Sequence, residues 1–265
     1  WSSIMSPTVK KMEAEGWLLD VYPLHDRMVI WIRTDQGKLL RLEDPFRFLI
    51  YARGGRGILE RLAETAVQKG FASGHFWDKR KELRSGQEVE VLALEVSEYD
   101  RLPGLLRKLP FLEEAVSFFN CDIPLGQYYL YSRSLLPLGR CGVEFAEGRV
   151  RAIHALDSPW DLEYAMPDLS TMELSFEGSD LLPFGKGNAL SVRCDGGGKT
   201  LVFDPGSPED LLREINLLLK RYDPDLLLTD HGDSFIIPSL LRLSQRWHVP
   251  LQFDREPTPI RRAIV

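Results

Sequence analysis

A short charged loop late in the chain has the residue types and spacing that best suit chemistry. It consists of Asp230, His231, Gly232 and Asp233. An apolar run at 225–229 predicts a short buried strand directly before the loop, and helices are predicted at 208–221 and from about residue 235. Open α/β sheets place their ligands at the carboxyl ends of their strands. The loop is therefore a candidate site for a bound ion or an acid–base group.

Each of these residues also has a purely structural explanation. An acid just before a helix, as Asp233 is, accepts backbone N–H bonds as a cap. A histidine in a turn, as His231 is, is more often a surface residue than a base. Glu177 ends a strand predicted at 169–178, and a solvated strand end explains it better than metal binding does.

Composition describes an ordinary globular chain of 265 residues, with 44% hydrophobic and 27% charged residues. This length allows two modest domains. The net charge of −6 argues against a nucleic-acid coat protein but not against an enzyme with a locally basic groove. No apolar run reaches the roughly 18 residues of a membrane span. Three widely spaced cysteines predict a reducing cytoplasm and no zinc site, and Trp1 in place of Met predicts a fragment or processed chain.

The first part of the chain is predicted to be rich in strands. Three apolar runs between residues 17 and 45 predict a β-meander, with Gly37 in a hairpin turn. Residues 46–120 predict the order β-α-β-β-α-β of a ferredoxin-like, split βαβ domain. RNA-recognition modules share this topology, and aromatic residues stand at 75–77, but the basic-aromatic motif of those modules is missing.

The rest of the chain predicts a linker, a strand pair and a second domain. The linker covers 121–139, the strand pair 143–157, and a turn-rich joint leads to Asp168. Further strands followed by helix, strand and helix predict a mixed sheet flanked by helices. A glycine tract at 195–200 lacks the spacing of a phosphate loop and predicts a turn. We expect α+β and α/β domains, divided at 1–140 and 141–265.

Four segments, in order, resemble the amino-terminal half of family B DNA polymerases, above all the archaeal type. They are EDPFRFLIYA (43–52), VSFFNCDIPLGQYYLYSRSLLPLG (116–139), PDLSTMELSFEG (167–178) with YDPDLLLTDHGDSF (222–235), and FDREPTPIRR (253–262). The resemblance implies a template-contacting amino-terminal domain followed by an incomplete 3′–5′ exonuclease domain of the ribonuclease H-like type.

The exonuclease motifs implied by this resemblance are degenerate. The family's first motif is phenylalanine, aspartate, any residue and glutamate; here it reads Phe176, Glu177, Gly178 and Ser179. The second ends in a ligand aspartate, where this chain has Ile236. Two-metal nuclease chemistry needs these carboxylates. We therefore expect no catalytic residue, no metal and no cofactor in this chain, with Mg²⁺ or Mn²⁺ only if the exonuclease site or a downstream polymerase domain is active.

Two alternatives remain open beside an inactive nuclease. One is a working nuclease with a rearranged carboxylate set of Glu177, Asp233 and Asp180. The other is a protein-interaction scaffold without a role on nucleic acid.

The resemblance also implies partners and contact residues. DNA is expected to meet His231, Ser234, Phe235, Arg255, Arg261 and Arg262, and a template-base pocket would involve Pro45 and Phe46. Expected partners are single-stranded or primer–template DNA and downstream polymerase domains or a partner polymerase subunit, but no membrane. A role in DNA replication or repair and a cytoplasmic, nucleoid-associated location follow.

Overall fold

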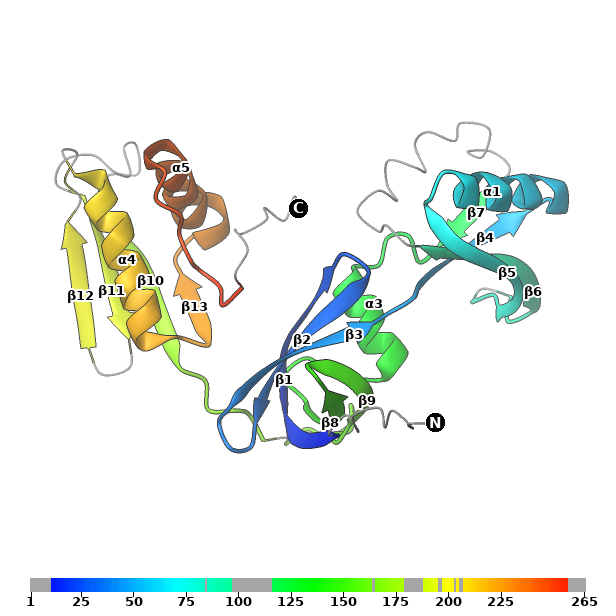
Figure 1. Cartoon of the computed structure of the whole chain (residues 1–265), viewed down its shortest axis with the longest axis horizontal. Coiled ribbons are helices and arrows are strands. Elements are labelled where there is room, and N and C mark those ends of the chain that lie inside the picture. The colour runs from blue at the N-terminus through cyan, green and yellow to red at the C-terminus, as the bar shows by residue number, and fades with distance from the viewer. Residues whose placement is uncertain are drawn as a thin grey trace, which may run out of the picture. The chain divides into compact units, whose positions relative to one another are not determined.

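The computed structural model divides the chain into two compact units, Trp1–Pro167 and Asp168–Val265. It describes residues 11–83, 85–96, 116–163, 165–178, 188–194, 197–202, 204 and 207–256. Secondary structure is mixed and dominated by sheets (Figure 1).

A closed five-stranded barrel forms one half of the first unit (Figure 1). Its strands are β1 (Met12–Leu24), β2 (Arg27–Thr34), β3 (Leu39–Pro45), β8 (Arg140–Ala146) and β9 (Arg149–Ala155). They follow the order β1-β2-β3-β9-β8, with β3 and β9 parallel and the other pairs antiparallel. Period-2 alternation along β2 points Met28, Ile30 and Ile32 into the barrel core. Gly37 has a φ of 74° in the turn before β3, as the sequence predicts.

The boundary between the two units does not lie at residue 140, where the sequence predicts it, because later strands complete the barrel. Strand β8 pairs with β1 along Met12–Trp17, and β9 pairs with β3 at Glu43. Residues 140–155 therefore complete the first unit instead of opening the second, and the boundary lies at Pro167. The position of the boundary thus depends on hydrogen bonds between strands that are far apart in the sequence.

A four-stranded antiparallel sheet is inserted between β3 and β8. It contains β4 (Phe48–Gly54), β5 (Ala72–Lys81), β6 (Glu88–Val96) and β7 (Val116–Phe119) in the order β5-β6-β4-β7. Helix α1 (Arg56–Gln68) buries Leu59, Leu62, Ala63 and Ala66, which lie on one helical face, against this sheet. The second helix expected in this region, near 99–109, lies outside the described residues.

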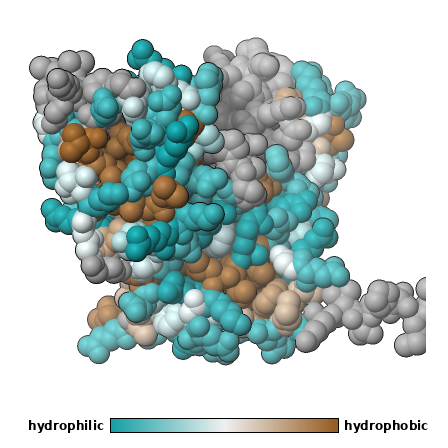
Figure 2. Space-filling model, turned by 60° about the vertical axis from the view of Figure 1, so that its left-hand side comes forward, coloured by the Kyte–Doolittle hydropathy of each residue, from teal (hydrophilic) through white to brown (hydrophobic). Residues whose placement is uncertain are grey.

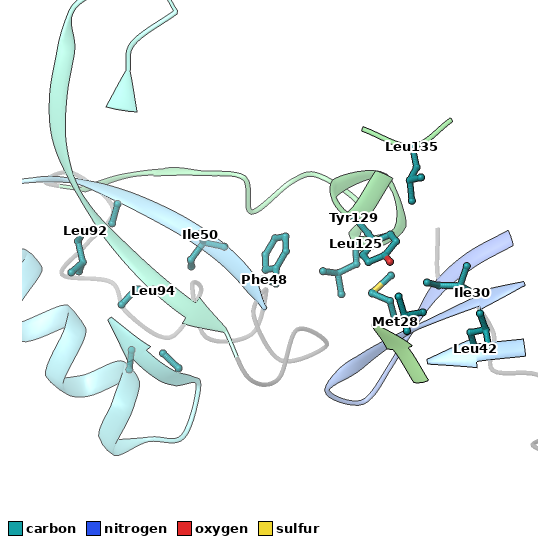
Figure 3. Close-up of a cluster of buried hydrophobic side chains, with 14 of the residues drawn as sticks. Met28, Ile30, Leu42, Phe48, Ile50, Leu92, Leu94, Leu125, Tyr129 and Leu135 are labelled. Carbon is teal, nitrogen blue, oxygen red and sulfur yellow. The ribbon is translucent and has the colours of Figure 1, made fainter. Parts of the chain in front are cut away.

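The segment expected to be a linker contains helix α3 (Leu125–Arg133). Leu125 and Tyr129, four residues apart, point into the same core as the barrel strands. Figure 3 shows Phe48 between the sheet side chains and this helix, and the Phe48 and Tyr128 ring centroids are 4.7 Å apart. The barrel and the sheet therefore share one hydrophobic core.

A buried polar contact ties α3 to the barrel. The Tyr129 hydroxyl donates to Asp44 Oδ2 over 2.8 Å, and Arg133 Nη2 donates to the same oxygen over 2.9 Å. Burial, together with the Asp44 carboxylate, raises the pKa of Tyr129 far above its usual range, so the hydroxyl keeps its proton. These two donors compensate the cost of burying a carboxylate that is 5% exposed.

The second unit is a four-stranded sheet with two helices on one face. Its elements are β10 (Thr171–Glu177), β11 (Ala189–Cys194), β12 (Gly197–Val202), α4 (Pro208–Tyr222), β13 (Leu226–Thr229), a π-helical turn η3 (Gly232–Ile236) and α5 (Ile237–Trp247). The strand order is β12-β11-β10-β13, and only the pair β10–β13 is parallel. Part of the glycine tract expected to be a turn, from Gly197 onwards, belongs to β12.

Core residues of this unit come from one face of its sheet and from both helices. Leu174 and Val192 from the strands cluster with Leu212 and Leu240 from α4 and α5. Apolar side chains also reach the surface in patches (Figure 2), and Val202, Leu217 and Leu228 are among those exposed. Among the helices in the described ranges, none combines the length and hydrophobicity needed to cross a membrane.

Removing the Tyr129 hydroxyl tests how far the buried contact stabilises the first unit. We expect Tyr129→Phe to lower its free energy of unfolding by about 1.5–3 kcal/mol, because a buried carboxylate loses a donor. Denaturant unfolding measures the change. The control is Tyr131→Phe on the same helix, where Tyr131 is 64% exposed and no loss is expected. Equal effects of the two changes would contradict a special role for Tyr129.

Burial also predicts the reactivity of the cysteines. Cys141 lies in the barrel core at 1% exposure, and burial raises the pKa of its thiol to about 12. We expect iodoacetamide at pH 8 to label Cys141 much more slowly than the half-buried Cys194, because the reactive thiolate is scarce and inaccessible. Mass spectrometry of tryptic peptides gives both rates, which should converge once denaturant unfolds the chain.

Candidate functional site

Parallel pairing of β10 and β13 brings the two expected motif segments together. Leu174 lies opposite Thr229 in this pair, so the carboxyl ends of both strands lie at the same edge of the sheet. The Phe176 and Phe235 ring centroids are 5.3 Å apart in an edge-to-face contact. The two segments that carry the motifs therefore lie side by side in the structure.

The loop backbone is held in one particular turn. His231 adopts the left-handed conformation with a φ of 52°, and its carbonyl accepts hydrogen bonds from Phe235 N over 2.8 Å and Ile236 N over 3.4 Å. A side chain at Gly232 would collide with the Thr229 side chain. Glycine is therefore required there by close approach, and this π-helical turn sets the direction of α5.

Ile236 occupies the position that the family motif gives to a ligand aspartate, and it is a core residue. Its exposure is 3%, and it clusters with apolar residues of β10, α4 and α5. A metal ion needs oxygen ligands that reach it. The described residues therefore do not fit the two-metal site that the motifs imply.

The remaining loop residues lie at the surface. Glu177, Asp230, His231 and Ser234 are exposed, and the Ser234 hydroxyl donates to the His231 carbonyl over 3.4 Å. Ser179, Asp180 and the Asp233 side chain lie outside the described residues. In the part of the chain that is described, no group of three or more His, Cys, Asp or Glu side chains is placed to hold a metal ion.

Arg255 holds the chain after α5 against the turn between α4 and β13. Its Nε donates to Asp223 Oδ1 over 2.6 Å, and its Nη2 donates to the Asp223 and Pro224 carbonyls and to Asp225 Oδ1 over 2.7, 3.1 and 3.2 Å. Asp225 also accepts from Ser170 N over 3.0 Å. Sequence analysis missed this network, whose only signal was an acid at each end of the 223–225 turn. Arg261 and Arg262 lie outside the described residues.

The residues expected to line a template-base pocket stand where β3 leaves the barrel. Pro45 is exposed and ends β3. Phe46 is half-buried, with its ring centroid 5.0 Å from that of Tyr129 and 5.8 Å from that of Tyr128. Phe46 therefore packs on helix α3, and its role toward a template base stays a prediction.

Known proteins are similar to this chain in sequence and in fold. A DNA polymerase of Archaeoglobus fulgidus is 23% identical over 257 residues, which cover 91% of this chain and 32% of that protein. A DNA polymerase of Pyrococcus horikoshii is 24% identical over 182 residues, covering 64% of this chain and 13% of that protein. The family B DNA polymerase of Pyrobaculum calidifontis matches in structure with a TM-score of 0.72 and 18% identity, over 91% of this chain and 33% of that one. The chain is homologous to archaeal family B DNA polymerases.

The homology is distant and covers part of the relatives. No protein-family model matches the chain. This polymerase homologue spans about a third of the length of the Archaeoglobus and Pyrobaculum proteins. The resemblance based on four segments is therefore confirmed at the level of the family, and the structural match shows a shared fold.

A carboxylate introduced at Ile236 tests whether this position belongs to the core. We expect Ile236→Asp to destabilise the second unit by about 3 kcal/mol or more, because a charge enters an apolar cluster. Denaturant unfolding measures the loss. Ser234→Asp is the matched control, since it adds the same charge at an exposed position of the same turn and should change little. An Ile236→Asp protein as stable as the control would contradict the assignment.

Proposed function

We propose that this chain is a nuclease-inactive, DNA-binding portion of a family B polymerase type of protein. It would correspond to the amino-terminal and exonuclease-like regions and support DNA in replication or repair. The observation that carries the loss of nuclease activity is Ile236, which is buried where the motif needs a carboxylate.

Topology supports the finer fold assignment in this proposal. In the second unit, three antiparallel strands are followed by a helix and a fourth strand parallel to the first, an order that also begins a ribonuclease H-like domain. The sheet of the first unit has the strand order β5-β6-β4-β7 of a ferredoxin-like domain. Both arrangements agree with the regions that the sequence segments imply.

Physical chemistry argues against a simple repair of the nuclease site. Two-metal hydrolysis requires carboxylates that hold both ions a few ångströms apart. An aspartate in place of Ile236 would put a charge among Leu212, Leu240 and their neighbours, so restoring that ligand would destabilise the second unit. Among the side chains that the structure describes, no group of three potential ligands is placed to hold a metal ion, and a single carboxylate such as Glu177 supplies too little ligand charge for tight binding of a hard cation.

The partners in this proposal are DNA, single-stranded or as primer–template, and either downstream polymerase domains or a partner polymerase subunit. The chain would act in the cytoplasm with the nucleoid. Polymerase activity of a longer protein would depend on residues outside this chain.

A nuclease assay tests the inactive assignment. We expect no 3′–5′ shortening of a 5′-labelled single-stranded oligonucleotide in Mg²⁺ or Mn²⁺, because the ligand set is incomplete. Denaturing gels after incubation measure the product ladder, and Glu177→Ala is the matched variant. Metal-dependent digestion that Glu177→Ala abolishes would overturn the assignment and favour the rearranged set of Glu177, Asp180 and Asp233.

A further inference from the structure

The barrel of the first unit has a topology that is independent of the exonuclease-like loop. Its five strands close in the order β1-β2-β3-β9-β8, with β3 and β9 parallel and helix α3 between the third and fourth strands in sequence. This is the arrangement of the OB-fold, a five-stranded Greek-key barrel. Barrels of this kind bind oligonucleotides or oligosaccharides across the outer face of their second and third strands.

The corresponding face here is aromatic and rich in arginine. Because Met28, Ile30 and Ile32 point inward, the alternating residues Arg27, Val29, Trp31 and Arg33 of β2 lie on the outer face. On this face Val29 is buried, and Arg27, Trp31 and Arg33 are half-buried. Arg41 on β3 lies opposite Trp31, and Tyr22 on β1 lies on the same outer side. Arg149 of β9 lies opposite Glu43 of β3 and extends this face. We call Tyr22, Arg27, Trp31, Arg33, Arg41 and Arg149 the barrel surface.

Local contacts hold these side chains ready for a ligand. The Trp31 indole N–H donates to the Tyr22 hydroxyl over 3.2 Å, which fixes both rings. Glu43 accepts from Arg27 Nη1 over 2.8 Å and from Arg41 Nη1 over 2.9 Å. These two guanidiniums lower the pKa of the Glu43 carboxyl, so it stays charged and holds both arginines along β3.

This face is rich in positively charged side chains, although the whole chain has a negative net charge. The barrel surface carries four arginines, and the acids beside them include Asp20, Asp26 and Glu43, in a protein with a net charge of −6. Partly exposed ion pairs contribute little to stability, so phosphate oxygens can replace Glu43 as partners of Arg27 and Arg41 at small cost. Phosphate needs such cationic donors.

We infer that the barrel surface binds single-stranded DNA, with bases stacked on Trp31 and Tyr22 and the backbone held by the arginines. Only unpaired bases expose the faces that stack on aromatic side chains, so duplex DNA is a poorer ligand. Stacking accepts any base, so binding has little sequence preference. The inference rests on the proposed DNA-binding function and gives it a location in the first unit.

An oligonucleotide-binding experiment tests the inference. A fluorescent oligothymidylate of about 12 nucleotides is titrated with the full chain, and fluorescence anisotropy gives the affinity at each salt concentration. Trp31→Ala should weaken binding by about fivefold or more, the loss expected for one stacked base. Arg41→Gln and Arg149→Gln should each reduce the slope of log K against log salt by about 0.7. The matched controls Trp160→Ala, at a residue that is 87% exposed, and Arg213→Gln on α4 should bind like the unmodified chain.

A gain of affinity separates binding from damage to the fold. Glu43→Gln removes the acid that pairs with Arg27 and Arg41, so it should tighten binding and steepen the salt dependence. The inference is overturned if the unmodified chain binds the oligonucleotide but all the barrel-surface variants bind as tightly as it does; the proposed DNA-binding function would then survive. Absence of any oligonucleotide binding by the unmodified chain overturns both. Tighter binding of a matched duplex or of oligouridylate RNA would also overturn the assignment to single-stranded DNA.

Discussion

The contact between Tyr129 and Asp44 is the interaction on which the first unit depends. Tyr129 fills the space where helix α3 meets the barrel, and its hydroxyl satisfies a carboxylate at the end of β3. The chain leaves the barrel directly after β3, builds a complete four-stranded sheet and returns through α3. One buried hydrogen bond therefore fixes the place where the inserted sheet departs and the helix by which the chain comes back.

In the second unit, the position where the family motif has a ligand aspartate belongs to the hydrophobic core. In a metal-dependent nuclease, the residue at the start of the helix after β13 would be held by the ion. Here Ile236 is held by Leu212, Leu240 and their neighbours, so burial of apolar surface supplies the order that ligation would have supplied. The parallel pairing of β10 and β13 and the contact between Phe176 and Phe235 persist, because they depend on packing. The contacts between the two motif segments are thus present although residue 236 is apolar.

The two units carry different kinds of surface. At the edge of the sheet where β10 and β13 end, the described carboxylates are dispersed, and Arg255 is engaged with Asp223 and Asp225 instead of being free for phosphate. On the barrel, arginines alternate with inward apolar residues and stand beside a half-buried pair of aromatic rings, Tyr22 and Trp31. Nucleic-acid binding in this chain is therefore better supported by the first unit than by the loop whose residue types first indicated chemistry.

Local pattern alone determined much of the structure. Alternation and a turn glycine predicted the strands between residues 17 and 45, and the amphipathic period predicted helix α4 at 208–221, where the structure has Pro208–Tyr222. Comparison of the motifs with a known family singled out Ile236, because an apolar residue cannot bind a metal ion wherever the chain folds. These conclusions depend only on residues that are close in the sequence or on the chemistry of a single side chain.

Only the tertiary structure decided three other features. Helix α3 carries too weak an amphipathic pattern to be told from a linker, and it forms because the barrel offers a core for Leu125 and Tyr129. The unit boundary at Pro167 follows from β8 and β9 pairing with strands more than 100 residues earlier. The barrel surface gathers residues of four strands that sequence spacing cannot relate. Each depends on contacts between distant segments, and such contacts leave no local signal.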